Sequence, residues 1–516
     1  MKGTPVNLVW FKRDLRVQDH EPLAEAAADG PVLGLFIYEP ALYRTGEFDP
    51  SHLIFLNQCL DDLGRALAAR GGVLVLRHGE AVEVLHRLAE EVPVKALFSH
   101  AETGNMITYR RDVRVAAWAA QRGIRWQQFR QDGVIRPLRS RDGWSARWAE
   151  RMNRPALLQP ERMASPRGLS GVGLLTPADL GLPPSAKPEA QRGGMNEAGA
   201  VMRSFLQERG VNYRADMSSP VEGWEGCSRL SPYLAFGCLS MRTIHQAAGS
   251  RVAELRALVR SGGPVDRRWL GSLSSFGARL RWHCHFMQKL EDEPRIEFEN
   301  FSRAFDGMRE EFSATLEAQE RFRRWQEGTT GYPMVDACMR AVRATGWLNF
   351  RMRAMVASFA AYHLWLHWRE PAVYLGRHFL DFEPGIHFSQ FQMQSGTTGI
   401  NTLRIYSPAK QALDQDPKGV FLRRWIPELA NVPESWLSQP HLMPWEMQTR
   451  CGCFIGKDYP APVVDHQAAV ALARERFAAV RKRPGTRAEA KRVLTKHGSR
   501  KRPAKRARPL VTATLL

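Results

Sequence analysis

The sequence predicts an α/β domain with a parallel sheet, followed by an all-α domain. The first part of this prediction depends on residues 1–135, where apolar runs typical of buried strands alternate with helix-like segments. Such alternation implies parallel strands joined by helices that cover the sheet. The second part depends on residues 197–475, where apolar residues recur mostly at helical spacing and β-branched runs are few.

In the N-terminal domain, apolar runs predict strands at VNLVWF, VLGLFIY, GVLVLRHG, KALFSH and IRWQQF, in that order. Helices are predicted between them, at EPLAEAAADG, at the segment in which Leu56, Leu60, Leu63 and Leu67 recur at helical spacing, at AVEVLHRLAEEV and around RRDVRVAAWAAQRG. Neither a Walker A pattern nor G-x-G-x-x-G occurs here, so common nucleotide-binding fingerprints give no support.

Residues 136–196 are rich in Pro, Arg, Gly and Ser and lack sustained periodicity, which predicts a long interdomain connection. Within the helical domain, residues 334–368 predict two helices joined near Thr345 and Gly346. The second, WLNFRMRAMVASFAAYHLWLHW, is apolar nearly all round and is therefore expected to be buried.

The chain carries 73 Lys and Arg against 53 Asp and Glu, a formal charge of +20. Residues 481–516 hold 13 of these cations and one acid, Glu489, so this segment contributes +12 and the remainder +8. We expect residues 476–516 to form a disordered basic tail that binds nucleic acid. A tail that only aids solubility is the alternative. The residual charge agrees with a polyanionic partner.

The seven cysteines are scattered, and the one close pair, Cys451 and Cys453, does not form a zinc or iron–sulfur pattern. His363 and His367 lie four residues apart, as metal ligands on a helix can, but no Cys or carboxylate pattern joins them. No metal site is therefore predicted. Without a signal peptide or a long uncharged apolar run, we expect a soluble cytoplasmic monomer with no membrane contact.

The stretch GCSRLSPYLAFG has the features of a helix start. Ser231 is predicted to be the N-cap and Pro232 the first helical residue. Free backbone N–H groups there, with Ser228 and Arg229 nearby, would suit a phosphate. An ordinary helix start without a ligand is the alternative.

Arg351 and Arg353 fall inside the apolar second helix, and a buried guanidinium is costly unless it is paired. Asp381 and Glu383 lie just beyond that helix and are the predicted partners. They begin a polar stretch, LDFEPGIHFSQFQMQSGTTG, which contains a histidine and three alternating glutamines. A polar stretch at this place in the helical domain suggests that it binds a ligand.

Taken together and in order, several motifs resemble the photolyase/cryptochrome family: SRLSPYLAFG, WQEGTTGYPMVDACMR, TGW…RMR…ASF, RIYSPAKQ and FLRRWIPEL. The N-terminal VWFKRDLRVQDHEPL is similar to the family's opening strand and loop, so the resemblance covers about residues 1–470. It implies a Rossmann-like antenna domain and an all-α domain that holds a U-shaped FAD. A carbon–carbon lyase follows from it, in which blue-light-excited reduced FAD donates an electron to a pyrimidine dimer.

Three functions are open under this resemblance. The first is repair of DNA, damaged duplex or single strand, with cyclobutane dimers as the expected lesion. The second is a cryptochrome-like FAD photoreceptor without repair. The third is a nucleic-acid-binding protein with a vestigial flavin fold, against which an intact Arg353–Asp381 pair would argue.

The resemblance assigns to FAD the residues Tyr213, Cys227, Ser228, Arg229, Leu230, Ser231, Arg353, Asp381, Phe382, Glu383 and His387. Cys227 replaces the family's usual Thr, and Glu383 stands where an Asp usually meets the polar edge of the flavin. His387 falls at the position facing flavin N5, usually Asn, where it would titrate near neutral pH. The alternative is a shifted register that leaves His387 in a loop.

The resemblance also assigns a lesion pocket. Trp282, Arg279 and His387 are expected to act in catalysis, and Arg279 stands where the family has a Glu that bonds the dimer. The residues expected to contact DNA are Trp282, Asn349, Phe350, Arg351 and Gln411.

The family's tryptophan electron-transfer chain is altered, because two of its positions fall at Phe391 and Met393. Trp368 matches a family tryptophan and Trp365 lies one turn before it, so these two are predicted to form another path. Packing in the core is the alternative for both. Residues 102–112 lie where an antenna pocket would form, but they do not predict which second chromophore, if any, is bound.

Overall fold

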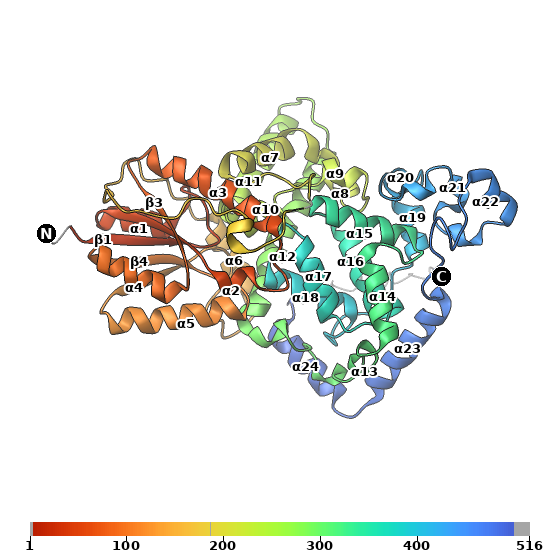
Figure 1. Ribbon diagram of the computed structural model, residues 1–516. Coiled ribbons are helices and arrows are strands. Elements are labelled where there is room, and N and C mark those ends of the chain that lie inside the picture. The colour runs from red at the N-terminus through yellow and green to blue at the C-terminus, as the bar shows by residue number, and fades with distance from the viewer. Residues whose placement is uncertain (1–3, 186, 500–516) are drawn as a thin grey trace, which may run out of the picture.

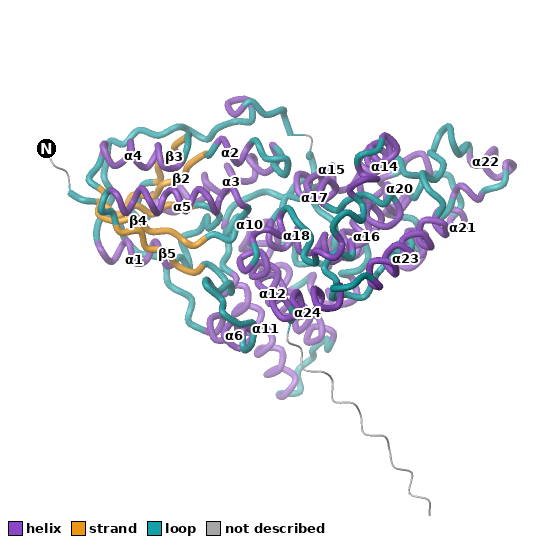
Figure 2. Tube along the Cα trace, turned by 90° about the horizontal axis from the view of Figure 1, so that it is seen from below, coloured by secondary structure: helices purple, strands orange, loops and turns teal. Residues whose placement is uncertain are grey.

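The computed structural model describes residues 4–185 and 187–499 (Figure 1). An α/β domain and an all-α domain are both present, as the sequence predicts. Figure 2 shows the strands gathered at one end of the molecule and helices making up most of the rest. In the described part of the chain, no helix combines the length and apolarity needed to cross a membrane.

The sheet has five parallel strands in the order β3-β2-β1-β4-β5. They are β1 (Val6–Phe11), β2 (Val32–Tyr38), β3 (Leu74–His78), β4 (Val94–Ala101) and β5 (Arg125–Arg130). Each matches a predicted apolar run. Every residue of β1 and β2 is buried, because both strands are central and both of their faces are covered.

Helices pack on both faces of the sheet. They are α1 (Glu21–Asp29), α3 (Pro50–Ala68), α4 (Ala81–Glu91) and α5 (Met106–Gln121). Successive side chains of a strand point to opposite faces, so Val9 packs with α1 and α3 while Leu8 packs with α4 and α5. The carboxyl ends of β1, β2 and β4 meet at the edge that adjoins the all-α domain.

Residues 136–196 run between the domains largely without regular structure, apart from α6 (Trp144–Asn153), a 3-10 turn (Ala178–Leu180) and the first residues of α7 (Met195–Gln207). The all-α domain then comprises α-helices of very different lengths, from four residues to 25. Those that position the site are α10 (Ser231–Ala235), α12 (Arg268–Asp292), α15 (Pro333–Thr345), α16 (Phe350–Ser358), α17 (Arg369–His378), α18 (Pro384–Ser395) and α19 (Pro408–Gln415).

The two helices predicted around Thr345 and Gly346 are confirmed as α15 and α16. Gly346 ends α15 with a left-handed φ of 73°, which glycine adopts without steric cost. The chain beyond α16 continues through a π-helical turn, Phe359–His363, and is buried there, as its apolar composition predicts.

The expectation of disorder from residue 476 is wrong as far as residue 499. Helices α23 (His466–Lys482) and α24 (Thr486–His497) cover this segment. Glu293, only 5% exposed, forms ion pairs with Arg492 and Lys496 and a hydrogen bond with His497, so two cations of the basic run have a buried acidic partner. Val493 on α24 is fully buried in a cluster with Leu290, Ile296 and Phe301. The rest of the expected tail, 500–516, lies outside the described residues.

Truncation after Ser499 is expected to weaken nonspecific DNA binding and flatten its salt dependence. Residues 500–516 contain six Lys and Arg and no acid, while α24 stays in place. Each lost phosphate contact on duplex DNA lowers the slope of log affinity against log salt by about 0.9. Fluorescence anisotropy with undamaged DNA at several salt concentrations measures both quantities. An identical slope for the truncated protein would show that these residues do not contact DNA.

Candidate functional site

A cavity of about 300 Å³ lies in the all-α domain among α10, α12, α16 and α18. Every residue predicted to hold FAD lines it except Leu230, which is buried beside it. The cavity also includes Trp282, Arg279, Asn349 and Phe350, which the sequence assigns to the lesion pocket. Residues from four separate segments of the chain therefore meet in one space.

The Arg353–Asp381 pair is confirmed. Arg353 Nη1 and Nη2 donate to Asp381 Oδ1 and Oδ2 at 2.9 and 2.8 Å, a bidentate geometry, and Nε donates to the Leu348 carbonyl. Burial alone would raise the pKa of Asp381, but the charge of Arg353 and hydrogen bonds from Arg353 and Ser231 hold it below its usual value. The wall of the cavity therefore carries a fixed, ionised pair.

Glu383 does not pair with either arginine of α16, contrary to the prediction. Its Oε2 lies 2.6 Å from Nε2 of His283, on α12, and both residues line the cavity. Burial alone would lower the pKa of His283, but Glu383 and Cys284 raise it well above its usual value. Arg351 lies outside the cavity lining, and its Nε is buried with no hydrogen-bond partner in the described chain.

Ser231 is the first helical residue of α10 and makes no capping bond, so the N-cap prediction is wrong. Its hydroxyl instead bonds Asp381, across the cavity wall. The guanidinium of Arg229 lies between the rings of Trp224 and Trp347, 4.1 and 4.2 Å from their centroids. Burial lowers the pKa of Arg229 to about 10, so this group remains cationic at neutral pH.

His387 lies in α18 and lines the cavity, so it does not occupy a loop. Its Nε2 is 2.6 Å from the carbonyl oxygen of Ala372, which makes Nε2–H the donor and leaves Nδ1 as the acceptor. Burial lowers the pKa of His387 to about 4. The expected titration near neutral pH is therefore wrong, because the buried ring stays neutral.

The exposed end of the cavity is formed by Arg279 and Phe350. The guanidinium of Arg279 lies 4.9 Å from the ring centroid of Phe350, which is 42% exposed, and Arg279 also bonds the hydroxyl of Tyr213. Trp282, one turn along α12 from Arg279, presents an aromatic face to the same space. Gln411 lies on α19 outside this lining, so it is not brought to the cavity.

Neither tryptophan of the predicted electron path lines the cavity. Trp368 is 1% exposed, its Nε1 donates to Asn300, and its ring lies 6.2 Å from Phe388 on α18. Trp365 is flanked by the guanidinium groups of Arg309 and Arg476, 4.7 and 4.6 Å from its centroid. Two cations over a ring oppose its oxidation to a radical cation, so a packing role is favoured for Trp365.

Trp368→Phe is expected to slow light-driven reduction of the bound flavin by an external thiol, because Trp368 is the buried indole that approaches α18. Phe391→Leu is expected to leave the rate near that of the wild type, because phenylalanine is not readily oxidised. Loss of oxidised-flavin absorbance under blue light gives both rates. The opposite ranking of the two variants would rule out the path through Trp368.

Gln390 and Gln394 are among the lining residues that sequence reasoning did not assign to the site. The alternation in FSQFQMQS suggests a period of two, whereas the segment is a helix. At helical spacing, His387, Gln390, Phe391 and Gln394 share one face, and this face lines the cavity. The preceding Pro384 and the following Gly396 are the signals that could have indicated a helix.

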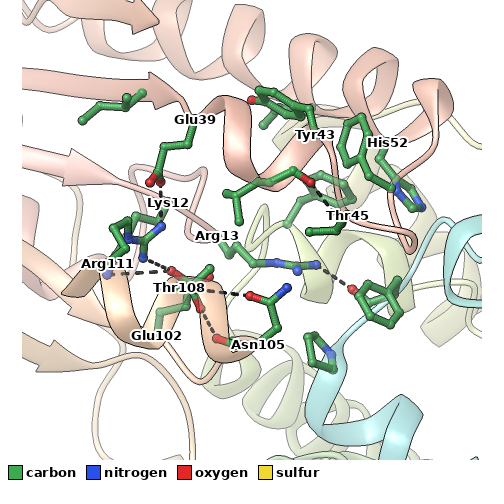
Figure 3. Close-up of a pocket in the computed structure, with 18 of the residues that line it drawn as sticks. Lys12, Arg13, Glu39, Tyr43, Thr45, His52, Glu102, Asn105, Thr108 and Arg111 are labelled. Atoms are coloured by element: carbon green, nitrogen blue, oxygen red, sulfur yellow. Dashed lines mark hydrogen bonds and ion pairs between the residues drawn. The ribbon is translucent and has the colours of Figure 1, made fainter. Parts of the chain in front are cut away.

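A second cavity, of about 140 Å³, lies at the carboxyl edge of the sheet (Figure 3). Arg111 donates to Glu39 and Glu102 at 2.7 and 2.6 Å there, and its guanidinium lies 4.9 Å from the centroid of Trp10. Residues of the predicted antenna segment 102–112 contribute to its lining. Phe382 lines both cavities, so the loop that carries it lies between them.

Comparisons with known proteins agree with this geometry. The family model described as the FAD binding domain of DNA photolyase matches residues 276–479, and the model described as DNA photolyase matches residues 7–146. A deoxyribodipyrimidine photo-lyase of Streptomyces griseus is 30% identical, covering 92% of this chain and 98% of that protein.

Solved structures are similar over nearly the whole chain. A Synechocystis cryptochrome superposes with a TM-score of 0.79 at 25% identity, covering 92% of this chain and 100% of that one. An archaeal photolyase from Sulfolobus tokodaii, described as containing two FAD molecules, superposes with a TM-score of 0.74 at 23% identity, covering 92% and 99%.

Proposed function

Because this chain belongs to the photolyase/cryptochrome family and contains its FAD-binding domain, we propose that it repairs pyrimidine dimers in DNA under blue light, with cyclobutane dimers as the substrate. One observation carries the proposal. The Arg353–Asp381 pair and the exposed end formed by Arg279, Trp282 and Phe350 belong to a single cavity. A base that enters the cavity at its exposed end would therefore contact the ligand that the Arg353–Asp381 pair binds.

The residues present fit FAD. Arg229 offers a buried cation for the pyrophosphate, and the Arg353–Asp381 pair offers a fixed donor and acceptor at the isoalloxazine. His387, whose Nε2–H is held by the carbonyl of Ala372, lines the cavity and has a neutral Nδ1 that can accept a hydrogen bond. When bound there, FAD supplies blue-light absorption and the electron for dimer cleavage, while these side chains bind it, orient it and exclude water.

At the exposed end, Trp282 provides a surface on which a flipped pyrimidine can stack. Arg279 can donate to pyrimidine carbonyl oxygens, a role for which the family's Glu would need to be protonated. Flipping a base out of the helix costs least for a damaged base, so a pocket of this kind favours lesions. The net charge of +20 supports association with DNA of either strandedness.

A light-sensing function without repair is the second candidate. The observation that favours it is that Arg279, packed on Phe350 at the entrance, stands where the family has a Glu that bonds the dimer. We further propose that the cavity bordered by Arg111 and Phe382 holds a second chromophore. The seven free cysteines fit the reducing cytoplasm, and light scattering checks the predicted monomer.

The test is repair of a defined lesion. The FAD-loaded protein, chemically reduced, is illuminated with an oligonucleotide that carries one cyclobutane thymine dimer, and dimer loss is followed by chromatography. Light-dependent loss is expected, with none in the dark. If no dimer is lost while reduced FAD stays bound, the same test on a (6-4) lesion follows, and failure there too would favour the light-sensing function.

A further inference from the structure

The three alternating glutamines of α18 have two different environments. Gln392 is completely used by the fold: its Nε2 donates to the carbonyls of Ile296 and Glu299 at 2.9 and 2.8 Å, and its Oε1 accepts from Phe301 N at 2.7 Å. Gln390 and Gln394 lie away from these contacts and line the cavity of about 300 Å³ in the all-α domain. The helix therefore uses one glutamine for packing and turns the other two toward the site.

The amides that face the cavity have unmet hydrogen-bonding capacity. Gln390 Oε1 is buried with no partner anywhere in the described chain, and Gln394 is only 5% exposed. A buried polar group without a partner costs about 1–3 kcal/mol. Since the fold satisfies Gln392 fully, the arrangement of its two neighbours is best explained by a ligand that completes their hydrogen bonds.

The surrounding wall limits what that ligand is. The stripe that holds the two amides also holds His387 and Phe391, and the facing side of the cavity includes Trp282 and Phe286. His387 is neutral, so the stripe of α18 carries no charge, while on the α12 side the charge of His283 is balanced by Glu383. Such a wall suits a flat, neutral ring, whereas a phosphate would need cations.

A primary amide offers one acceptor and two donors, and its O and N lie side by side. The imide edge of a thymine, an N–H flanked by carbonyl oxygens, is complementary to this pair of groups. Enzymes that extrude a base read it through this edge and by stacking. Residues four apart on a helix lie about 5–6 Å from each other, so two amides can serve two bases that are joined to one another.

We propose that Gln390 and Gln394 bind the imide edges of the two pyrimidines of a dimer in the cavity and thereby determine its selectivity for damaged DNA. This inference rests on the proposed repair function. Arg279, at the exposed end beside Phe350, then contributes to entry of the lesion, while the amides identify it inside. The flavin ring has an imide edge of its own, so the test must separate these two sources.

The test compares Gln390→Met and Gln394→Met, which keep the side-chain length and remove the amide. Full-length, FAD-loaded protein is titrated in the dark against a labelled single-stranded oligonucleotide with one cyclobutane thymine dimer, and against the same oligonucleotide undamaged. Each variant is expected to lose about tenfold in affinity for the damaged strand, because the loss of one buried hydrogen-bonding group weakens binding by about this factor. Affinity for the undamaged strand should not change.

Two matched variants serve as controls. Gln392→Met is expected to lower the melting temperature, because three backbone groups lose their partner, and to leave the damaged-to-undamaged affinity ratio unchanged. Gln319→Met, on the exposed side of α14 (Leu316–Glu327), should change neither quantity.

Three results would overturn the inference. An unchanged affinity ratio in both methionine variants would show that the amides do not bind the lesion. A fall in the flavin-to-protein ratio without a change in the affinity ratio would assign them to the imide edge of FAD instead. Equal binding of both oligonucleotides by the wild-type protein would refute the proposed repair function and this inference together, and the wild-type titration distinguishes that case from the first two.

Discussion

Asp381→Asn is expected to release most of the FAD during purification. The carboxylate accepts both terminal nitrogens of Arg353, and its side chain is only 5% exposed. An amide of the same shape cannot balance the guanidinium, which would remain in the cavity wall without a counter-charge. Because the Arg353 side chain is 28% exposed, we expect a cost of about 2 kcal/mol, roughly thirtyfold in affinity.

The measurement is the ratio of flavin absorbance to protein after gel filtration, with reconstitution by added FAD as a second reading. Asp414→Asn is the matched control, since it removes the same charge from an exposed ion pair with Lys410 on α19. That variant should retain FAD like the wild type, because exposed pairs contribute little. Equal retention by the Asp381 and Asp414 variants would show that the buried pair is not needed to hold the cofactor.

The Arg353–Asp381 pair could be predicted because it follows from a local conflict. A guanidinium inside an apolar helix needs a counter-charge, and a carboxylate stands just beyond that helix in the sequence. The same reasoning predicted the wrong partner for Glu383. Its partner, His283, lies 100 residues earlier in the chain, and a charge count from Lys, Arg, Asp and Glu leaves histidine out. Sequence reasoning identifies that a charge needs compensation, but only the fold decides which group provides it.

The C-terminal segment shows the same limit. Its cations outnumber its acids so strongly that disorder was the natural expectation. The acid that pairs with two of these cations, Glu293, follows the last residue of α12, and Val493 supplies the apolar contact that anchors α24. By contrast, the central strands β1 and β2 could be predicted individually, because a fully buried parallel strand is recognisable from its own apolar run.

Acidification is expected to destabilise the protein steeply between about pH 6.5 and pH 4. Burial lowers the pKa of several histidines to between about 2 and about 4; these are His52, His100, His285, His363, His378, His387 and His497. In that pH range the unfolded chain, whose histidines have a pKa near 6.5, binds protons that the folded chain does not. Stability therefore falls as the pH falls, by about 2 kcal/mol for each such histidine at pH 5.

Other ionisable groups change the pH dependence of stability in both directions. Burial raises the pKa of Glu297 to about 7, so this carboxyl favours the folded state at lower pH. Lys187 and hydrogen bonds overcome burial to lower the pKa of Asp49 to about 2, which adds to the loss in acid. Burial also raises the pKa of Asp132, Asp336 and Asp416, so these carboxyl groups favour the folded state in acid as well. The same holds for His283, because burial alone would lower its pKa but Glu383 raises it. The seven histidines and the paired carboxyl groups with a lowered pKa, such as Asp49 and Asp381, are expected to outweigh them, so stability still falls as the pH falls.

Melting temperatures from pH 7.5 down to 4.5 measure this effect, and His378→Phe tests its cause. His378 Nδ1 is buried with no partner among the described residues, and its ring packs 4.6 Å from Tyr374, a contact that phenylalanine preserves. The variant should match the wild type near neutral pH and lose less stability in acid, because one proton-binding site of the unfolded chain is gone. His86→Phe, on the exposed face of α4, should show the same change of melting temperature with pH as the wild type. If instead both variants show the same slope as the wild type, neutral buried histidines do not cause the acid sensitivity, and the loss must come from the protonation of paired carboxylates.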